Sequence, residues 1–308
     1  MPIYSSAVQS VPIHYVSPDE DSSRWIDFPF REGDIVISAR SKTGTTWLQM
    51  ICALLVFQAP ELPDSLAKLS PWLDWLITPR ADVYQQLADQ DHRRFIKTHT
   101  PLDGLPVDAR VTYVVTGRHP LDTAVSLYHH RGNLNRERIR ELAGQPGSGP
   151  IIDRRPPLHQ WLLGWIEQDV DPKDSLDSLP GVMWHLTDAW NRRAAQEVVF
   201  VHYDDLVHDL DAEMRHLASR LGISVPEQTW PALVEAATFA QMRARAASIA
   251  PDPSDILKDQ TAFFRRGSSG AAAETLSPVE LDRYYLRAST MAPPDALAWL
   301  HHGARRVP

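Results

Sequence analysis

The sequence predicts an α/β fold, in which a central parallel β-sheet is flanked by helices on both sides. Short apolar runs rich in β-branched residues alternate with longer helical segments along the 308 residues. The run at residues 35–37 is continuously apolar, as in a strand that is covered on both faces. A hydrophobic content of 43% is ordinary for a protein with a core. The length fits one large domain or two small ones, and a single domain over residues 1–308 is expected.

The first strand, residues 35–37, leads into a loop and then a helix. The loop covers residues 41–44 and ends on a glycine, which can take a backbone conformation that other residues resist. The helix is expected to run through residues 47–55, with Thr45 or Thr46 as its cap.

This strand–loop–helix segment is a candidate anion site. Free backbone N–H groups and a helix N-terminus converge there, and Lys42 adds a full positive charge. The standard P-loop has Gly, four residues and then Gly-Lys-Ser/Thr, whereas Lys42 here comes two residues before Gly44. That order disfavours an ATPase or a GTPase. Taken alone, the segment is equally compatible with an ordinary turn that carries a solvated lysine.

Further elements follow from the same patterns. Three more strands are expected at residues 94–99, 110–116 and 198–203. Helices are expected at residues 83–89, 120–128, 158–167, 182–194, 211–221, 230–247 (with a break near Thr238) and 278–288. The segments expected to be irregular are an N-terminal arm (residues 1–30), a mobile loop (133–157) and a covering loop (251–274).

Polar residues stand where these strands end. Lys42 follows the first strand, His99 ends the second, Arg118 follows the third and Tyr203 ends the fourth. Ligands of parallel sheets bind at the carboxyl ends of the strands. We therefore expect these four side chains to meet at one edge of the sheet.

Lys97 and His99 lie two apart on one strand, so their side chains share a face. A histidine has a pKa near neutrality, which suits it to remove a proton from a hydroxyl group, and Lys97 would add positive charge beside it. The alternative is that both residues are solvated at the end of the strand.

Three arginines are candidate phosphate ligands. Arg118 can fork onto a phosphate and Ser126 can add one hydroxyl bond, while Arg265 and Arg266 precede a flexible glycine, Gly267. Each feature alone is also compatible with a solvated turn.

The composition excludes several functions. The net charge of −8, from 31 Lys+Arg against 39 Asp+Glu, argues against general nucleic-acid binding. The single cysteine, Cys52, fits a reducing cytoplasm. The longest apolar run, residues 50–57, is too short to span a bilayer, and the N-terminus lacks the pattern of a signal peptide. No Cys/His cluster with ligand spacing is present, so no metal site is expected.

Taken together, four motifs resemble those of the cytosolic-type sulfotransferase family, which uses 3′-phosphoadenosine 5′-phosphosulfate (PAPS), and they occur in the family's order. They are residues 41–47, 96–102, 114–126 and 265–270. The resemblance covers residues 35–300 and is strongest to the bacterial glycolipid-sulfotransferase branch.

The resemblance implies a P-loop-NTPase-like sulfotransferase fold and transfer of a sulfonate from PAPS to a hydroxyl group of a small molecule or glycolipid, giving PAP and a sulfate ester without a metal ion. It implies that Lys42 contacts the transferring sulfonate, Lys97 assists and His99 takes the acceptor proton. The residues that it places around the nucleotide are Thr43, Gly44, Thr45, Thr46 and Trp47 at the 5′-phosphate, Arg118, Ser126, Arg265, Arg266 and Gly267 at the 3′-phosphate, and Trp47, Tyr203, Thr238 and Phe239 at the adenine.

Three positions depart from the family pattern. Ser41 stands where the family usually has proline, and Ala271 and Ala272 stand where the C-terminal loop continues with Asp-Trp. Two other functions remain open: a P-loop kinase-like phosphotransferase that uses Mg²⁺ and ATP, and a PAPS- or PAP-binding module without catalysis.

The acceptor is not specified by any motif, and neither is the oligomeric state. A lipid reached at a membrane surface, or a flat aromatic acceptor, would fit an apolar pocket, although most of the candidate lining residues are equally compatible with the core. Those candidates are Trp72, Trp75, His129, His130, Trp161 and Trp165.

Overall fold

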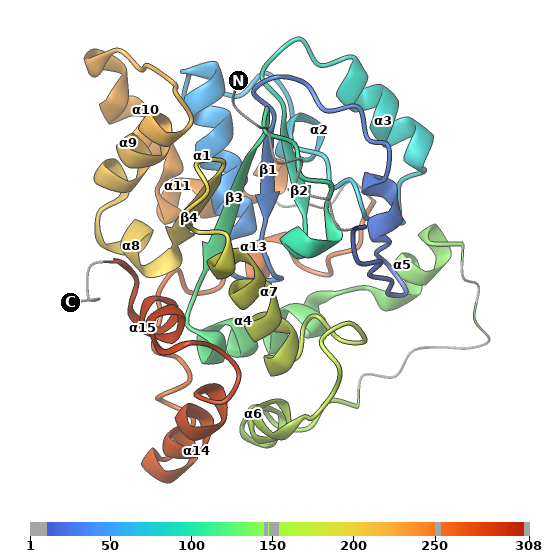
Figure 1. The fold of residues 1–308 in the computed structure, drawn as a ribbon, viewed down its shortest axis with the longest axis vertical. Coiled ribbons are helices and arrows are strands. Elements are labelled where there is room, and N and C mark those ends of the chain that lie inside the picture. The colour runs from blue at the N-terminus through green and yellow to red at the C-terminus, as the bar shows by residue number, and fades with distance from the viewer. Residues whose placement is uncertain (1–10, 145–146, 148–153, 250–253, 305–308) are drawn as a thin grey trace, which may run out of the picture.

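The computed structural model describes residues 11–144, 147, 154–249 and 254–304. A four-stranded parallel sheet in the order β2-β1-β3-β4 forms its centre, and helices lie on both sides of it (Figure 1), which confirms the predicted fold class. The strands are β1 (Ile35–Ser38), β2 (Phe95–Thr98), β3 (Thr112–Gly117) and β4 (Val198–His202).

Helices connect and surround these strands. The longer ones are α1 (Thr45–Phe57), α3 (Arg80–Ala88), α4 (Pro120–Asn133), α6 (Leu158–Glu167), α7 (Leu179–Asn191), α9 (Leu210–Arg220), α10 (Trp230–Ala237), α14 (Pro278–Ala288) and α15 (Pro294–His302). The shorter ones are α2 (Leu66–Leu69), α5 (Arg136–Leu142), α8 (Tyr203–His208), α11 (Phe239–Ala244), α12 (Ala246–Ile249), α13 (Gln260–Phe263) and the 3₁₀ turns η1 (Ser22–Trp25), η2 (Leu102–Gly104) and η3 (Glu227–Thr229).

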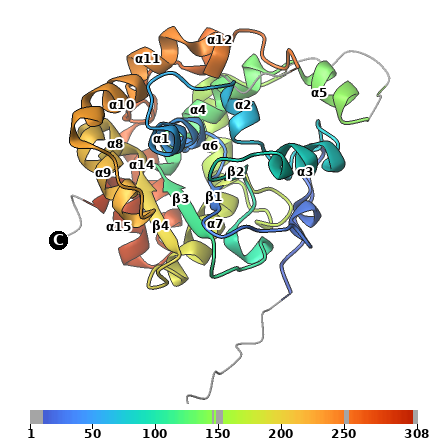
Figure 2. The ribbon, with the colours of Figure 1, turned by 90° about the horizontal axis from the view of Figure 1, so that it is seen from above.

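The apolar run of β1 explains why the sheet is covered on both faces. Successive side chains of a strand point to opposite faces, and Ile35 and Ile37 pack with α1, α9 and α10, while Val36 packs with Val83 and Leu87 of α3. Figure 2 shows the sheet from above, with α1 and α10 on one side and α3 and α7 on the other. All three β1 side chains are fully buried, which holds the end of β1, and the loop that follows it, in a fixed place.

A separate apolar cluster joins α4, α6, α7, α14 and α15. Trp165 of α6, Tyr284 of α14 and Trp299 of α15 are buried in it, as are Ala271 and Ala272. Since α4 begins just after β3, this cluster supports the region where the strands end.

Several boundaries differ from the sequence-based expectation. The cap of α1 is Gly44 with a left-handed backbone, not Thr45 or Thr46, because the chain must turn sharply into the helix. Tyr203 begins α8 and does not end β4. The break at Thr238 is confirmed, since it separates α10 from α11.

Several helices were not expected from the sequence, among them α5, α8, α13 and α15. Helix α5 lies in the segment that was expected to be a mobile loop (residues 133–157). Asn135 caps this helix, and Ile139 packs against the core, so the helix has an apolar face although most of its residues are charged. Residues 145–146 and 148–153 of that segment lie outside the described residues. Helix α15 buries Trp299 and Leu300.

In the part of the chain that the structure describes, no helix is long and apolar enough to cross a membrane.

A buried ion pair at the start of β1 leads to a prediction about stability. Asp34 accepts from Arg94 Nε at 2.8 Å and from its Nη2, and both side chains are almost fully buried. We expect Asp34→Asn to lower the free energy of unfolding by about 3–5 kcal/mol, because Arg94 is left as an uncompensated buried charge. Urea unfolding followed by tryptophan fluorescence measures the loss.

The exposed pair of Asp108 and Arg110 provides the matched control. Asp108→Asn should cost about 1 kcal/mol or less. Equal losses in the two variants would contradict the importance of the buried pair.

Candidate active site

A cavity of about 420 Å³ opens where the four strands end. That volume is within the usual range for a small-molecule site. Most of the residues predicted to form the site line it, namely Lys42, Gly44, Thr45, Thr46, Trp47, Lys97, His99, Arg118, Ser126, Tyr203, Phe239, Arg265, Arg266 and Gly267.

Two predicted site residues are not among the described residues that line the cavity. The Thr43 hydroxyl donates to the Arg40 carbonyl at 2.7 Å and lies 2.6 Å from the hydroxyl of Thr116, so its side chain fastens the loop from behind. The Thr238 hydroxyl donates to the Glu235 carbonyl at 2.9 Å and caps α11. A motif places a residue in the chain but does not determine which way its side chain points.

The loop between β1 and α1 forms a concave cradle of backbone groups. Lys42 and Gly44 both have left-handed backbone angles, with φ of 70° and 111°. A Cβ on Gly44 would lie 3.1 Å from the Tyr203 ring, so the position demands glycine. The first N–H groups of α1 have no partner within the helix, and the buried Thr45 hydroxyl has no hydrogen-bond partner. These unsatisfied donors suit an anion.

Three cationic side chains that line the cavity each lie over an aromatic ring. Lys42 Nζ lies 3.9 Å from the centre of the Phe263 ring, and Lys97 Nζ lies 3.7 Å from that of Trp72. The Arg118 guanidinium carbon lies 4.1 Å from the centre of the Tyr203 ring. These rings belong to Phe263 from α13, Trp72 from the loop before α3, and Tyr203 from α8.

None of the three cations forms an ion pair with a carboxylate in the described part of the chain. Arg118 instead donates to the carbonyls of Lys42 and Ser268, at 3.3 and 3.2 Å, and its buried Nε has no partner. The positive charge is thus held in place but is not neutralised.

This arrangement lowers the pKa of both lysines. Burial, together with Arg118, Lys97 and Arg265, lowers the pKa of Lys42 to about 7. Burial lowers the pKa of Lys97 to about 8, although Glu20 and Asp74 partly offset the effect. An anion in the cavity would restore the charged form of both.

His99 directly follows β2, which ends at Thr98 and not at His99 as expected, and one of its ring nitrogens is used in a hydrogen bond. Its Nδ1 donates to the carbonyl of Ala39, which leaves Nε2 with the lone pair. Burial, then Lys97 and Arg40, hold the pKa of His99 well below its ordinary value, so the ring is neutral at pH 7. Its edge meets the Trp72 ring at 4.5 Å between centroids. A neutral imidazole with a free lone pair can accept a proton.

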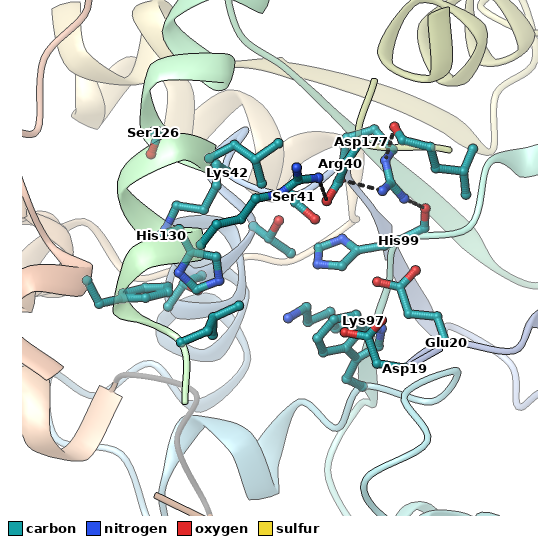
Figure 3. Close-up of a pocket in the computed structure, with 18 of the residues that line it drawn as sticks. Asp19, Glu20, Arg40, Ser41, Lys42, Lys97, His99, Ser126, His130 and Asp177 are labelled. Carbon is teal, nitrogen blue, oxygen red and sulfur yellow. Dashed lines mark hydrogen bonds and ion pairs between the residues drawn. The ribbon is translucent and has the colours of Figure 1, made fainter. Parts of the chain in front are cut away.

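Arg40 fixes the strand end that carries His99. Its guanidinium donates to the His99 carbonyl, to the Leu176 carbonyl at 3.1 Å and to Asp177 at 2.7 Å. Figure 3 shows Arg40 and Asp177 beside His99, with Lys42 and His130 across the cavity. The Arg40–Asp177 pair was not predicted, because 137 positions separate its partners and no motif links them.

The segment that carries Arg265, Arg266 and Gly267 covers one side of the cavity. A Cβ on Gly267 would lie 2.5 Å from the Phe239 ring, so the two approach closely only because Gly267 has no side chain. Arg266 is paired with Glu274 at 2.9 Å, which directs part of its charge away from the cavity.

Asp122 of α4 anchors the covering segment further along. Its carboxylate accepts from the backbone N–H of Gly270 at 2.8 Å and from that of Ala272 at 3.4 Å. Ala271 and Ala272, the departure from the family pattern, are buried in the core. The segment is therefore held down by backbone hydrogen bonds that do not need the family's Asp-Trp side chains.

Only some of the candidate acceptor residues reach the cavity. Trp72, Trp75 and His130 line it, whereas Trp165 lies in the core cluster with α6. His129 and Trp161 are not among the described lining residues. Two acidic residues of the N-terminal arm, Asp19 and Glu20, also line the cavity and were not predicted.

In the described ranges, no cluster of three or more histidine, cysteine or acidic residues has the arrangement of a metal site.

A parallel sheet with an anion cradle after β1 and unpaired cations around one cavity is typical of a P-loop-like α/β protein that acts on an anionic ligand. Residues 32–286 match the sequence model of the sulfotransferase domain family. The glycolipid sulfotransferase of Mycobacterium bovis (strain BCG / Pasteur 1173P2) is 40% identical over 310 residues, which cover 94% of each chain. Sulfotransferase 1A1 of Canis lupus familiaris is 25% identical over 270 residues, or 84% of this chain and 83% of that protein.

Solved structures share the fold. Retinol dehydratase in complex with androsterone and the inactive cofactor PAP has a TM-score of 0.67 at 19% identity, over 91% of this chain and 89% of that chain. Mouse sulfotransferase SULT7A1 complexed with PAP has a TM-score of 0.63 at 20% identity, over 87% of each chain.

The chain therefore belongs to the sulfotransferase family and is an enzyme of that class. The stronger resemblance to the bacterial glycolipid branch is confirmed by the difference between 40% and 25% identity.

The lowered pKa of Lys42 leads to a prediction about proton uptake. At pH 8 a lysine with a pKa of about 7 is mostly neutral, and a bound anion raises its pKa again. Binding of PAP at pH 8 should therefore take up about one proton at Lys42 and roughly half a proton at Lys97, whose pKa is about 8, and the affinity should fall as the pH rises above 7. Calorimetry in two buffers of different ionisation heat measures the uptake.

Lys42→Met should remove most of this uptake, and Lys97 accounts for what remains. Identical binding heats in the two buffers for the unmodified protein would contradict the assignment.

Proposed function

We propose that this enzyme transfers the sulfonate group of PAPS to a hydroxyl of a glycolipid or another small-molecule acceptor, releasing PAP and a sulfate ester. The observation that carries the proposal is a single cavity that is lined by three unpaired cations, Lys42, Lys97 and Arg118, and by a neutral histidine, His99. The related glycolipid sulfotransferases and the PAP-bound structural neighbours support the acceptor and the donor.

The residues present fit PAPS as a substrate. Backbone N–H groups at Thr45 and Thr46, with the unpartnered Thr45 hydroxyl, would hold the 5′-phosphate. The unpartnered Nε of Arg118 and the hydroxyl of Ser126 would hold the 3′-phosphate, with help from the segment at residues 265–267. Aromatic side chains that would border the adenine are Trp47, Tyr203 and Phe239.

The placement of two side chains changes their proposed roles. Thr43, fastened to Arg40 and Thr116, shapes the loop without presenting its hydroxyl to the phosphate. Thr238 caps a helix and supports Phe239, which follows it. We assign neither side chain a direct contact with the nucleotide.

The proposed reaction needs one base and one electrostatic stabiliser. His99 Nε2 takes the proton of the acceptor hydroxyl, whose oxygen forms a bond to sulfur as the bond from sulfur to the phosphate oxygen breaks. The negative charge then grows on the 5′-phosphate, where Lys42 and the α1 N-terminus stabilise it. In charged form, Lys97 stabilises the sulfonate oxygens during transfer.

Two alternatives are disfavoured by particular observations. A kinase-like phosphotransferase expects a lysine directly after the loop glycine, whereas Lys42 precedes Gly44 and rests on Phe263. A binding module without catalysis has no use for a buried neutral His99 beside Lys97. We also propose a cytoplasmic location, which the single buried thiol of Cys52 supports, with access to lipid acceptors at a membrane surface.

The first prediction concerns the base. We expect His99→Ala to lower kcat by roughly 10²- to 10⁴-fold while PAP binding stays nearly unchanged, because the base contacts the acceptor and not the nucleotide. A screen of hydroxyl acceptors with isotope-labelled PAPS, read by mass spectrometry, measures the sulfated product.

His129→Ala is the matched control, since His129 is exposed beside the cavity. Normal turnover by His99→Ala would exclude its role as base. A strict requirement for Mg²⁺ and ATP would overturn the proposed function and favour the kinase.

The second prediction concerns the 3′-phosphate. Arg118→Ala should weaken the binding of PAP by roughly 10- to 100-fold, as expected for loss of a charged hydrogen bond. It should weaken the binding of adenosine 5′-phosphate much less. Calorimetric titration of both nucleotides gives the two ratios. Equal weakening would remove Arg118 from the 3′-phosphate site.

A further inference from the structure

One half of the cavity, the acidic half, is lined by Asp19 and Glu20 of the N-terminal arm. Lys42, which precedes the α1 N-terminus, lies on the other side (Figure 3). Figure 3 shows both acidic side chains on the side of the cavity where Lys97 and His99 lie, away from Ser126. The acidic half has no role in binding an anionic nucleotide, so it requires a different explanation.

Backbone pairing holds the two acidic residues in place. Glu20 forms a bridge with Trp75, and the N–H of Leu76 donates to the Asp19 carbonyl at 2.9 Å. The N–H of Asp21 donates to the Asp74 carbonyl at 2.8 Å. These residues are therefore built into the wall beside the stacked rings of Trp72 and Trp75, whose centroids are 4.8 Å apart.

The polar groups of this half are largely unused by the protein. The Asp19 carboxylate accepts only from the Ser17 hydroxyl, at 3.2 Å, and the Glu20 carboxyl has no hydrogen-bond or ion-pair partner among the described residues. Across the cavity, His130 has a buried Nδ1 without a partner. Buried polar groups are normally satisfied, so the buried, unpartnered Nδ1 of His130 indicates that a ligand completes it, and the half-buried carboxyls of Asp19 and Glu20 are open to the same ligand.

We propose that Asp19, Glu20 and His130 form a subsite for the carbohydrate ring of the acceptor, which presents one hydroxyl to His99. A sugar ring offers hydroxyls along its edges, which carboxyl and imidazole groups bind. Its C–H face can lie against a flat ring such as that of Trp75. This inference rests on the proposed sulfonate transfer. It specifies that the carbohydrate ring of the acceptor enters the cavity and that these three side chains bind it.

A neutral polyol fits better than an ammonium group. Burial, together with Asp74, Asp19 and Asp177, raises the pKa of Glu20 to about 8, although Arg40 opposes the shift. A protonated carboxyl both donates to and accepts from a hydroxyl but attracts a cation weakly. Lys97 and Arg40 nearby further disfavour a cationic ligand.

The test compares octyl β-glucoside, which has a sugar ring, with 2-naphthol, which has one hydroxyl and no sugar. We expect Glu20→Leu to lower the ratio of kcat/KM for the glucoside to kcat/KM for 2-naphthol about 10-fold, as for loss of a hydrogen bond. His130→Phe should lower the same ratio. Glu20→Gln should restore much of it, because an amide also donates and accepts.

Asp64→Leu, at an exposed acidic residue paired with Lys68, is the matched control and should leave the ratio unchanged. An unchanged ratio in Glu20→Leu and His130→Phe, or turnover of 2-naphthol but of no glucoside by the unmodified enzyme, would overturn the subsite alone. Failure of the unmodified enzyme to sulfate any hydroxyl acceptor would instead count against the proposed function.

Discussion

The site depends on keeping several cations close together, largely out of water and without carboxylate partners. Such charges repel one another and lose hydration, which is costly, and the lowered pKa of Lys42 reflects that cost. Aromatic rings under Lys42, Lys97 and Arg118 hold the charged groups without neutralising them. The buried sheet and α1 supply the rigidity that such an arrangement requires, since a flexible loop would relax and let the cations separate.

Burial is also the main reason that His99 is neutral. It lowers the pKa of the ring, and the positive charges of Lys97 and Arg40 lower it further, because another positive charge there is unfavourable. The hydrogen bond from its Nδ1 to Ala39 then determines which nitrogen is available. Burial thus acts on both kinds of group in the cavity, since it lowers the pKa of Lys42 and of Lys97 and keeps the proposed base neutral.

Much of this arrangement could be predicted from the sequence. The β-branched run at Ile35–Ile37 indicated a doubly covered strand, and the rule for the carboxyl ends of parallel strands brought Lys42, His99 and Arg118 together. What could not be predicted depends on contacts between distant segments or on side-chain direction. Phe263 beneath Lys42 and Glu20 in the cavity wall carry no local signal, and Thr43 follows its motif while its hydroxyl points away. Helix α5 could not be predicted either, because most of its residues are charged and only Ile139 and Leu142 pack against the core.

The anchoring of the covering segment by Asp122 has a kinetic consequence. Asp122 and Ser126 both belong to α4, and Arg118, just before that helix, also bonds the carbonyl of Ser268. The cover is thus fastened to the same element that presents the proposed 3′-phosphate ligands. A nucleotide bound beneath this cover, as proposed, would leave faster once these hydrogen bonds open, so we expect departure of the spent nucleotide, and not bond making, to limit how often the enzyme turns over.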